Sequence, residues 1–211
     1  MDENNRKQNK LILFDWGNIV ESHKTGYSCL KAWEKLFKKC GYNYDIDTEK
    51  LTKYRLSAIT DEESFEKVFY MIKKDFKLNV NYNEFIKYYY ECFNNIEYYK
   101  NVKDYEISLK NKCYIGIFSN LLMFDKERLD KQVELINYDY VFLSFELGYR
   151  KPEIEIYKKV QNQLPFSKEN ILFIDDKIDN IKSAKKMGWN TLCASGLELN
   201  KIKEVCEKFL N

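Results

Sequence analysis

Two short apolar runs that each end abruptly in acid constrain this chain more than any other feature. Residues 11–17 read LILFDWG and residues 171–180 read ILFIDDKIDN, so Asp15 closes the first run while Asp175 and Asp176 close the second. Short runs rich in Ile, Leu and Phe are typical of strands buried in a parallel sheet. The carboxyl ends of such strands meet at one edge, where open α/β sheets bind ligands. Carboxylates gathered there predict a Mg²⁺ site and phosphoryl chemistry.

The rest of the chain alternates between strand-like and helix-like patterns, which predicts a doubly wound parallel sheet. We expect five strands, at 11–15, 113–118, 140–144, 171–175 and 191–194. Helical patterns separate the later strands, at 126–137, 153–164 and 179–187, and the last of these stops at Gly188, a typical helix end. The predicted fold class is therefore α/β, with a five-stranded Rossmann-like sheet.

The interval from about 24 to 104 differs because its apolar spacing is helical throughout. Leu30, Trp33 and Phe37 belong to one stripe, and the stretch 82–99 is rich in aromatic residues. These aromatic faces either form a small core of their own or partly line a pocket. An all-helical block placed directly after the first strand predicts a cap over the active edge of the sheet.

The expected domain organisation follows from these patterns. We expect a polar, disordered tail at 1–10, a Rossmann-like catalytic core formed by 11–23 and 105–211, and an inserted helical cap at 24–104.

Composition and charge bear on the class of partner. The 211 residues are 45% hydrophobic and 32% charged, which suits one globular domain with an insertion. With 35 Lys and Arg against 33 Asp and Glu, the net charge of +2 offers no case for nucleic-acid or membrane binding. No apolar run has the character of a secretory signal or a membrane span. The six cysteines lack metal-binding spacing, so we expect reduced, buried thiols in a cytoplasmic protein. The oligomeric state stays open.

Four polar elements follow the predicted strands in a fixed order. They are Asp15, the Ser119–Asn120 pair after CYIGIF, Lys151 in GYRKP, and Asp175 and Asp176 with Asn180 in DDKIDN. Any one of them alone could be a helix cap or a solvated side chain. Together they resemble the haloacid dehalogenase-like superfamily of Asp-nucleophile phosphohydrolases, over nearly all of 11–24 and 105–195. The stretches LGYRKPEIEIY and FIDDKIDNIKSAKKMGW are especially similar to its sugar-phosphatase branches.

The resemblance implies a Mg²⁺ site. The ion would be held by Asp15, by the backbone carbonyl of Gly17 and by Asp176. Asp175 would be either a second metal ligand or a residue that hydrogen-bonds to the ligands and orients them. Asn180 would have the latter role.

The resemblance also implies the chemistry. Asp15 would attack a phosphomonoester and form an aspartyl-phosphate that water hydrolyses. Lys151 would be a catalytic point charge close to the phosphoryl oxygens. Ser119 and the Asn120 amide would donate hydrogen bonds to the same oxygens.

One position departs from the family's usual first motif, Asp-x-Asp, whose second Asp is the general acid and base. Residues 15–18 read DWGN, so Gly17 stands where that carboxyl would be. General acid–base catalysis typically contributes about 10²–10⁴-fold to rate. Three outcomes stay open. A nearby group such as Glu21 or His23 replaces the acid, the substrate has a leaving group that does not need it, or catalysis has been lost.

The predicted function is a Mg²⁺-dependent phosphatase acting on a small phosphorylated metabolite such as a sugar phosphate. Some branches of the family that resemble this chain also carry Asp-x-Gly-Asn and are sugar-1-phosphatases. The alternative is a non-catalytic or weakly active binding protein with the same fold. A mutase is disfavoured because reversible transfer depends on the missing acid, and a dehalogenase because it works without Mg²⁺.

Overall fold

A five-stranded parallel sheet lies at the centre of the computed structural model, which describes residues 8–22, 28–57, 62–122, 125–126, 129 and 135–211. The strands are β1 (Leu11–Phe14), β2 (Tyr114–Ser119), β3 (Tyr140–Leu143), β4 (Ile171–Asp175) and β5 (Asn190–Cys193), in the spatial order β3-β2-β1-β4-β5. Each lies within one residue of its predicted range. The α/β fold class with a doubly wound parallel sheet is therefore confirmed.

The middle of the sheet is β1, whose four residues are all buried. Leu13 lies opposite Gly116 of β2 on one side and Phe173 of β4 on the other. A Cβ on Gly116 would lie 2.7 Å from the Tyr140 carbonyl oxygen, so this close approach of β2 and β3 needs glycine. The chain runs from β1 to β2 and β3, then crosses to β4 and β5. Ligand sites of open α/β sheets form at such a reversal.

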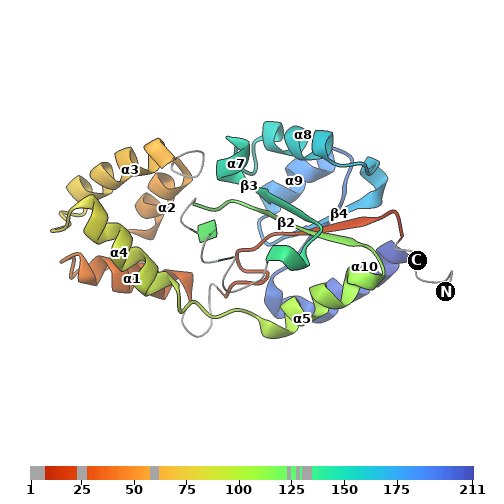
Figure 1. Ribbon diagram of the computed structural model, residues 1–211, viewed down its shortest axis with the longest axis horizontal. Helices are drawn as coiled ribbons and strands as arrows, with labels where there is room; N and C mark the ends of the chain where they lie inside the picture. Colours follow the sequence, from red (N-terminus) through yellow and green to blue (C-terminus); the bar gives the residue numbers. More distant parts are fainter. Residues whose placement is uncertain (1–7, 23–27, 58–61, 123–124, 127–128, 130–134) are drawn as a thin grey trace.

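Helices cover both faces of the sheet (Figure 1). One face carries α7 (Ser144–Leu147), α8 (Ile154–Gln163) and α9 (Ile178–Lys186), and the other carries α5 (Lys100–Ser108) and α10 (Leu199–Leu210). Successive residues of β1 point to opposite faces of the sheet. Ile12 packs in the cluster that contains Ile202 of α10, and Leu13 packs in the cluster that contains Ile156 of α8. The predicted helices at 153–164 and 179–187 correspond to α8 and α9. The one predicted at 126–137 lies largely outside the described residues.

Between β1 and β2 the chain forms a helical insertion, made of α1 (Cys29–Lys39), α2 (Thr48–Ser57), α3 (Glu62–Asp75) and α4 (Tyr82–Phe93). It has a hydrophobic cluster of its own, which contains Trp33, Phe37, Phe69 and Phe85. In Figure 1 it lies at the end of the molecule away from the C-terminus. Leu30 departs from the expected stripe, because it is 44% exposed.

The chain passes from the sheet into the helical insertion and back again along two segments that lie side by side. The Ser22 N–H donates to the Glu97 carbonyl, and the Tyr99 N–H donates to the Val20 carbonyl. The boundary expected after residue 104 falls inside α5, which packs beneath the sheet in the cluster of Ile12. We therefore propose that the insertion ends before α5 and that α5 belongs to the core.

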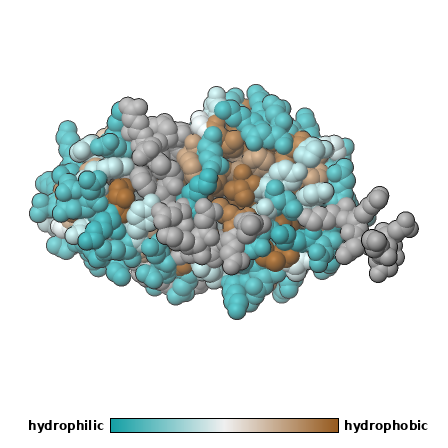
Figure 2. Space-filling view, viewed as in Figure 1, coloured by the Kyte–Doolittle hydropathy of each residue, from teal (hydrophilic) through white to brown (hydrophobic). Residues whose placement is uncertain are grey.

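The N-terminal segment, the cysteines and the surface can also be compared with the sequence-based expectations. Of the expected tail only residues 8–10 are described, and Lys10 Nζ donates to the Phe209 carbonyl at 2.7 Å. All six cysteines are free, and all but the half-buried Cys193 are buried. No described helix has the length and apolar character needed to cross a membrane. On the face drawn in Figure 2, hydrophilic residues cover most of the surface, while hydrophobic ones gather over the sheet.

Candidate active site

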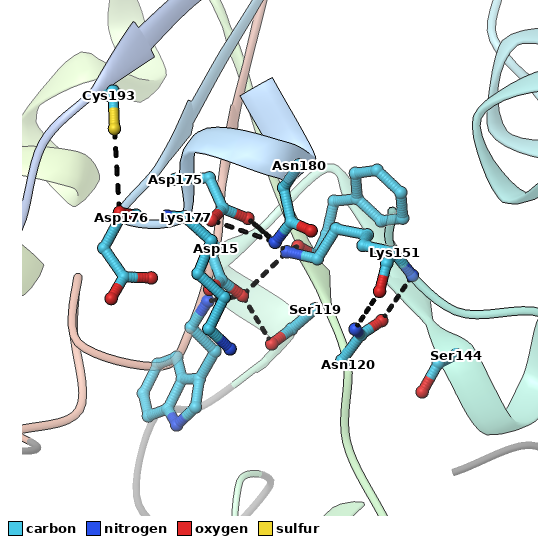
Figure 3. Close-up of polar contacts among 12 residues, drawn as sticks. Asp15, Ser119, Asn120, Ser144, Lys151, Asp175, Asp176, Lys177, Asn180 and Cys193 are labelled. Atoms are coloured by element: carbon cyan, nitrogen blue, oxygen red, sulfur yellow. Dashed lines mark hydrogen bonds and ion pairs between the residues drawn. The ribbon is translucent and has the colours of Figure 1, made fainter. Parts of the chain in front are cut away.

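Asp15 follows β1 directly and occupies the centre of the site (Figure 3). Its Oδ1 accepts hydrogen bonds from the Trp16 N–H and Ser119 Oγ, both at 2.7 Å, and contacts Lys151 Nζ at 2.9 Å. Burial would raise the pKa of Asp15, but the charges of Lys151 and Lys177 and these hydrogen bonds hold that pKa below its ordinary value. The carboxylate is therefore ionised at neutral pH, with Oδ2 outside these three contacts.

Lys151 is a buried cation, only 2% exposed. Its Nζ contacts Asp15 Oδ1 at 2.9 Å and Asp175 Oδ2 at 2.7 Å, and donates to the Phe118 carbonyl at 2.8 Å. Burial would lower the pKa of Lys151, but the two carboxylates outweigh it and raise that pKa. Since an ammonium has three donors, all three are occupied, and Lys151 can act on a ligand through its charge.

The backbone of Lys151 is fixed by Asn120. Asn120 Nδ2 donates to the Lys151 carbonyl, and the Lys151 N–H donates to Asn120 Oδ1, both at 2.8 Å (Figure 3). The side-chain amide of Asn120 is therefore taken by the loop that carries the lysine. Any contact of this residue with a phosphoryl group falls to its backbone N–H.

Asp175, the last residue of β4, has both carboxylate oxygens engaged. Asn180 Nδ2 reaches Oδ1 at 3.0 Å and Oδ2 at 2.8 Å. The Lys177 N–H donates to Oδ1 at 2.8 Å, and Lys151 binds Oδ2. Burial raises the pKa of Asp175 against the opposing charge of Lys151. This carboxylate is thus built to hold Lys151 in place.

Asp176 is placed differently from its neighbour. Its Oδ2 accepts from Asn18 Nδ2 at 2.9 Å, whereas its buried Oδ1 has no hydrogen-bond partner among the described residues. Asn18 has a φ of 58°, and its Oδ1 is also buried without a hydrogen-bond partner among the described residues. Buried oxygens without donors are costly.

A divalent cation fits this environment. Carboxylate oxygens of Asp15, Asp175 and Asp176 lie within 4.8 Å of one another. Mg²⁺ prefers oxygen ligands of this kind, and it would satisfy the buried Asp176 oxygen that has no donor. The donor set therefore suits the ion that the sequence predicts.

The turn after β1 brings a further acid to the site. Gly17 and Glu21 form an isolated bridge, and the Asn18 N–H donates to the Glu21 carbonyl at 2.9 Å. The Glu21 side chain is 4% exposed and accepts from Trp16 Nε1 at 3.2 Å. His23, the other acid candidate, lies outside the described residues.

A cavity of about 90 Å³ adjoins these groups. Asp15, Glu21 and Lys151 contribute to its wall from the core, and Tyr89 and Phe93 contribute from α4 of the helical insertion. The two units also bond to each other here, because the buried Tyr89 OH donates to Asp125 Oδ1 at 2.7 Å. The cavity is therefore closed partly by the insertion.

Comparison with known proteins decides the family. The sequence model of the haloacid dehalogenase-like hydrolases matches residues 12–194, which include all the strand-end residues above. The chain belongs to the haloacid dehalogenase-like hydrolase family. Among solved structures of this family, a predicted hydrolase from Porphyromonas gingivalis is similar, with 20% identity and a TM-score of 0.71 over 93% of this chain and 97% of that one.

A haloacid dehalogenase family enzyme from Bacteroides thetaiotaomicron, in complex with magnesium and inorganic phosphate, has 20% identity and a TM-score of 0.68. The match covers 89% of this chain and 94% of that one. At these identities the two structures show a shared fold. A sesquiterpene phosphatase of Aspergillus oryzae is 37% identical over 51 residues, 24% of this chain and 26% of that protein. The chain spans about a tenth to a quarter of the curated relatives that it matches.

The structure brings together every strand-end residue that the sequence singled out in this haloacid dehalogenase-like hydrolase. They are Asp15, Gly17, Ser119, Asn120, Lys151, Asp175, Asp176 and Asn180. Sequence reasoning missed Asn18, Lys177 and Asp125, and it noticed Tyr89 only as part of the aromatic stretch 82–99. Lys177 could have been noticed because it follows the acid pair directly. Both expected uses of that stretch occur, since Tyr89 and Phe93 belong to the hydrophobic cluster of the insertion and also line the cavity. Asp125 carries no local signal, because it meets Tyr89 only across the fold.

Proposed function

We propose that this hydrolase is a Mg²⁺-dependent phosphatase acting on a small phosphorylated metabolite. The observation that carries the proposal is the fixed, ionised Asp15 carboxylate beside the buried cation of Lys151. Three contacts hold Oδ1, so Oδ2 is the atom available for attack. The nearby positive charge lowers the repulsion between this carboxylate and a phosphate dianion.

The proposed reaction has two steps. Asp15 Oδ2 bonds to phosphorus as the bond to the leaving oxygen breaks, and the departing oxygen takes that electron pair. Water then attacks the phosphorus of the aspartyl-phosphate, releases inorganic phosphate and restores the carboxylate. Lys151 stabilises the phosphoryl oxygens by charge, and the Asn120 N–H would donate to them. The Ser119 hydroxyl, whose one hydrogen binds Asp15 Oδ1, would donate to them after turning away from Asp15.

The implied cofactor is Mg²⁺, and the buried Asp176 Oδ1, which has no donor among the described residues, supports it. Asp15, Asp176 and the Gly17 carbonyl would hold the ion, which when bound neutralises charge on the phosphoryl group. Asp175 is better suited to orienting Lys151, since both of its oxygens are occupied. Asn180 supports that role through its bonds to Asp175.

Substrate choice in this proposal depends on Gly17 and on the helical insertion. Without a carboxyl at position 17, leaving groups that carry charge easily are favoured, such as an anomeric sugar oxygen, a phenol or an acyl group. The insertion acts as a cap, because Tyr89 and Phe93 close the cavity that would hold the phosphoryl group. Free, buried cysteines suit a reducing compartment such as the cytoplasm.

Turnover of p-nitrophenyl phosphate tests the proposal. We expect nitrophenol release that requires Mg²⁺ and stops with a chelator. Asp15→Asn, which keeps the shape but removes the nucleophile, should reduce kcat at least about 10³-fold while leaving the circular dichroism spectrum unchanged. Binding of Mg²⁺ and phosphate without turnover would favour the alternative, a non-catalytic binding protein. Halide release from a 2-haloacid without Mg²⁺ would favour a dehalogenase.

A further inference from the structure

A second cavity, of about 410 Å³, adjoins the catalytic one and has no part in the chemistry described above. The two cavities share Asn120, Lys151, Lys177 and Asn180. Thr52 of α2 also borders the second cavity, so the helical insertion contributes to it. A substrate with its phosphoryl group at Asp15 could therefore extend its leaving group past Lys177 into this space.

Lys177 supplies a positive charge where the cavities meet. Its N–H is bound to Asp175, but its exposed side chain forms no ion pair with any residue that the structure describes. The charge reaches the catalytic cavity, because it contributes to the lowered pKa of Asp15. Figure 3 shows this side chain beside Asp15. An ammonium in this position is available to a ligand.

Arg150 adds a second cation to the wall of the larger cavity. Its Nε pairs with Glu153 Oε1 at 3.2 Å, and a guanidinium has five N–H donors, so this contact leaves others for a ligand. The acid in the same wall, Asp179, already pairs with Lys182 at 2.9 Å. The wall of the second cavity therefore offers two cations, Lys177 and Arg150, with donors left for a ligand.

From this lining we propose that the second cavity is a leaving-group subsite for an anion. Preferred substrates then carry a carboxylate or a second phosphate on the leaving group. This anion would lie where the Lys177 and Arg150 side chains can bind it. The inference rests on the proposed phosphatase function. Charge-assisted hydrogen bonds to such an anion are stronger than those to a neutral hydroxyl, so the two cations favour acidic substrates over neutral sugars.

Two esters of the same shape test the subsite, namely 4-carboxyphenyl phosphate and its neutral amide, 4-carbamoylphenyl phosphate. We expect the wild-type protein to favour the carboxylate in kcat/KM by about tenfold, the effect of one charge-assisted hydrogen bond. Lys177→Met and Arg150→Met should each reduce this ratio, and the double variant should bring it close to one. Lys177→Arg should keep it. Lys158→Met, which removes an exposed lysine of α8 outside both cavities, is the matched control and should leave the ratio unchanged.

Binding measured without turnover separates the two proposals. Calorimetry of the Asp15→Asn protein with Mg²⁺ should show tighter binding of the carboxylate ester than of the amide, and Lys177→Met should remove the difference. Equal affinities, or a ratio that Lys177→Met leaves intact, would overturn the subsite. If neither ester nor p-nitrophenyl phosphate is hydrolysed, the phosphatase function is wrong. The binding comparison still decides whether the cavity selects an anion.

Discussion

Gly17 is the residue whose chemistry most affects the expected substrate range. With no carboxyl at that position to protonate the leaving oxygen, kcat/KM should fall steeply as the leaving group becomes more basic. We expect anomeric, aryl and acyl phosphates to react much faster than primary alkyl esters. Gly17→Asp should narrow that gap by supplying the acid. The measurement is kcat/KM for a graded series of phosphate esters with both proteins.

A flat series in the wild-type protein would show that an acid is present after all. Glu21 is then the first candidate, because it is buried in the wall of the catalytic cavity. Glu21→Gln should in that case convert the flat series into a steep one.

Asp176 and Asn180 should differ in their effect on Mg²⁺ binding. Asp176 has a buried oxygen without a donor, whereas Asn180 touches only Asp175 with its side-chain nitrogen. Asp176→Ala should therefore weaken Mg²⁺ binding by more than about tenfold, and Asn180→Ala by less. Calorimetric titration with Mg²⁺ alone measures both. Equal dissociation constants for the wild-type protein and Asp176→Ala would contradict the assignment.

Glu106 of α5 should make the stability of the fold depend on pH. It is fully buried and accepts from the Tyr138 OH at 2.7 Å, and burial raises its pKa from 4.5 to about 8. Between these values the folded protein holds a proton that the unfolded chain releases, so the free energy of unfolding falls as pH rises. Glu106→Gln keeps an acceptor for Tyr138 but cannot ionise. It should flatten this dependence and be more stable than the wild type at pH 8, by roughly 4 kcal/mol.

Urea denaturation between pH 5 and pH 8.5 would check that expectation. The control is Glu204→Gln, which changes an exposed acid of α10 and should keep the wild-type profile. Identical pH profiles for Glu106→Gln and the wild-type protein would refute a neutral, buried carboxyl.

At the scale of elements, a buried hydrogen bond from the Tyr89 OH to Asp125 ties α4 to the core. Tyr89→Phe removes only the hydroxyl, so the free energy of unfolding should fall by about 1–2 kcal/mol. Tyr88→Phe, on a half-buried neighbour in the same helix, should change it by less than about 0.5 kcal/mol. Chemical denaturation of the two variants makes the comparison. Similar losses in both would mean that the bond contributes nothing.

The strands were predictable because their physical signal is local. Each is a short apolar run whose end is marked by a polar residue, and parallel strands bring such ends together, so Asp15, Ser119 and Asp175 were expected to meet. The boundary of the insertion was not predictable, since a helical period shows that α5 buries one face but not which core receives it. For the same reason the exposed Leu30 looked like part of a buried stripe.

Other features of the site had no counterpart in the sequence. Ligand binding by Asn120 stays a prediction for its backbone N–H, because its side chain binds the Lys151 backbone, a contact between residues 31 positions apart that the sequence did not indicate. The second cavity likewise arises only where α2 approaches the loop after β4.

For the whole molecule, two consecutive leucines join the cluster of the helical insertion to one of the two clusters that flank the sheet. Leu121 packs in a cluster beneath the sheet, while Leu122 packs in the cluster of the helical insertion. Leu122→Ala should therefore cost about 2–4 kcal/mol and also loosen the coupling between the units. Calorimetry should show one unfolding transition for the wild-type protein and a broadened or double one for the variant.

Leu36→Ala provides the control, because Leu36 lies within the insertion cluster alone. It should destabilise the insertion without the loss of coupling that is specific to Leu122→Ala. A single sharp transition in Leu122→Ala would show that the two units are held together elsewhere.

The two hydrogen-bonded segments 20–22 and 97–99, along which the chain leaves the sheet and returns to it, have an evolutionary consequence. Because the chain leaves the sheet and returns to it at one place, held by hydrogen bonds between the two crossing segments, the connection from β1 to β2 does not depend on what lies between them. Descendants can lengthen, shorten or exchange the intervening helices without re-threading the sheet. The helical insertion, which helps to line the cavity at Asp15, can thus diverge rapidly, while the carboxylates and the lysine of the site stay in register.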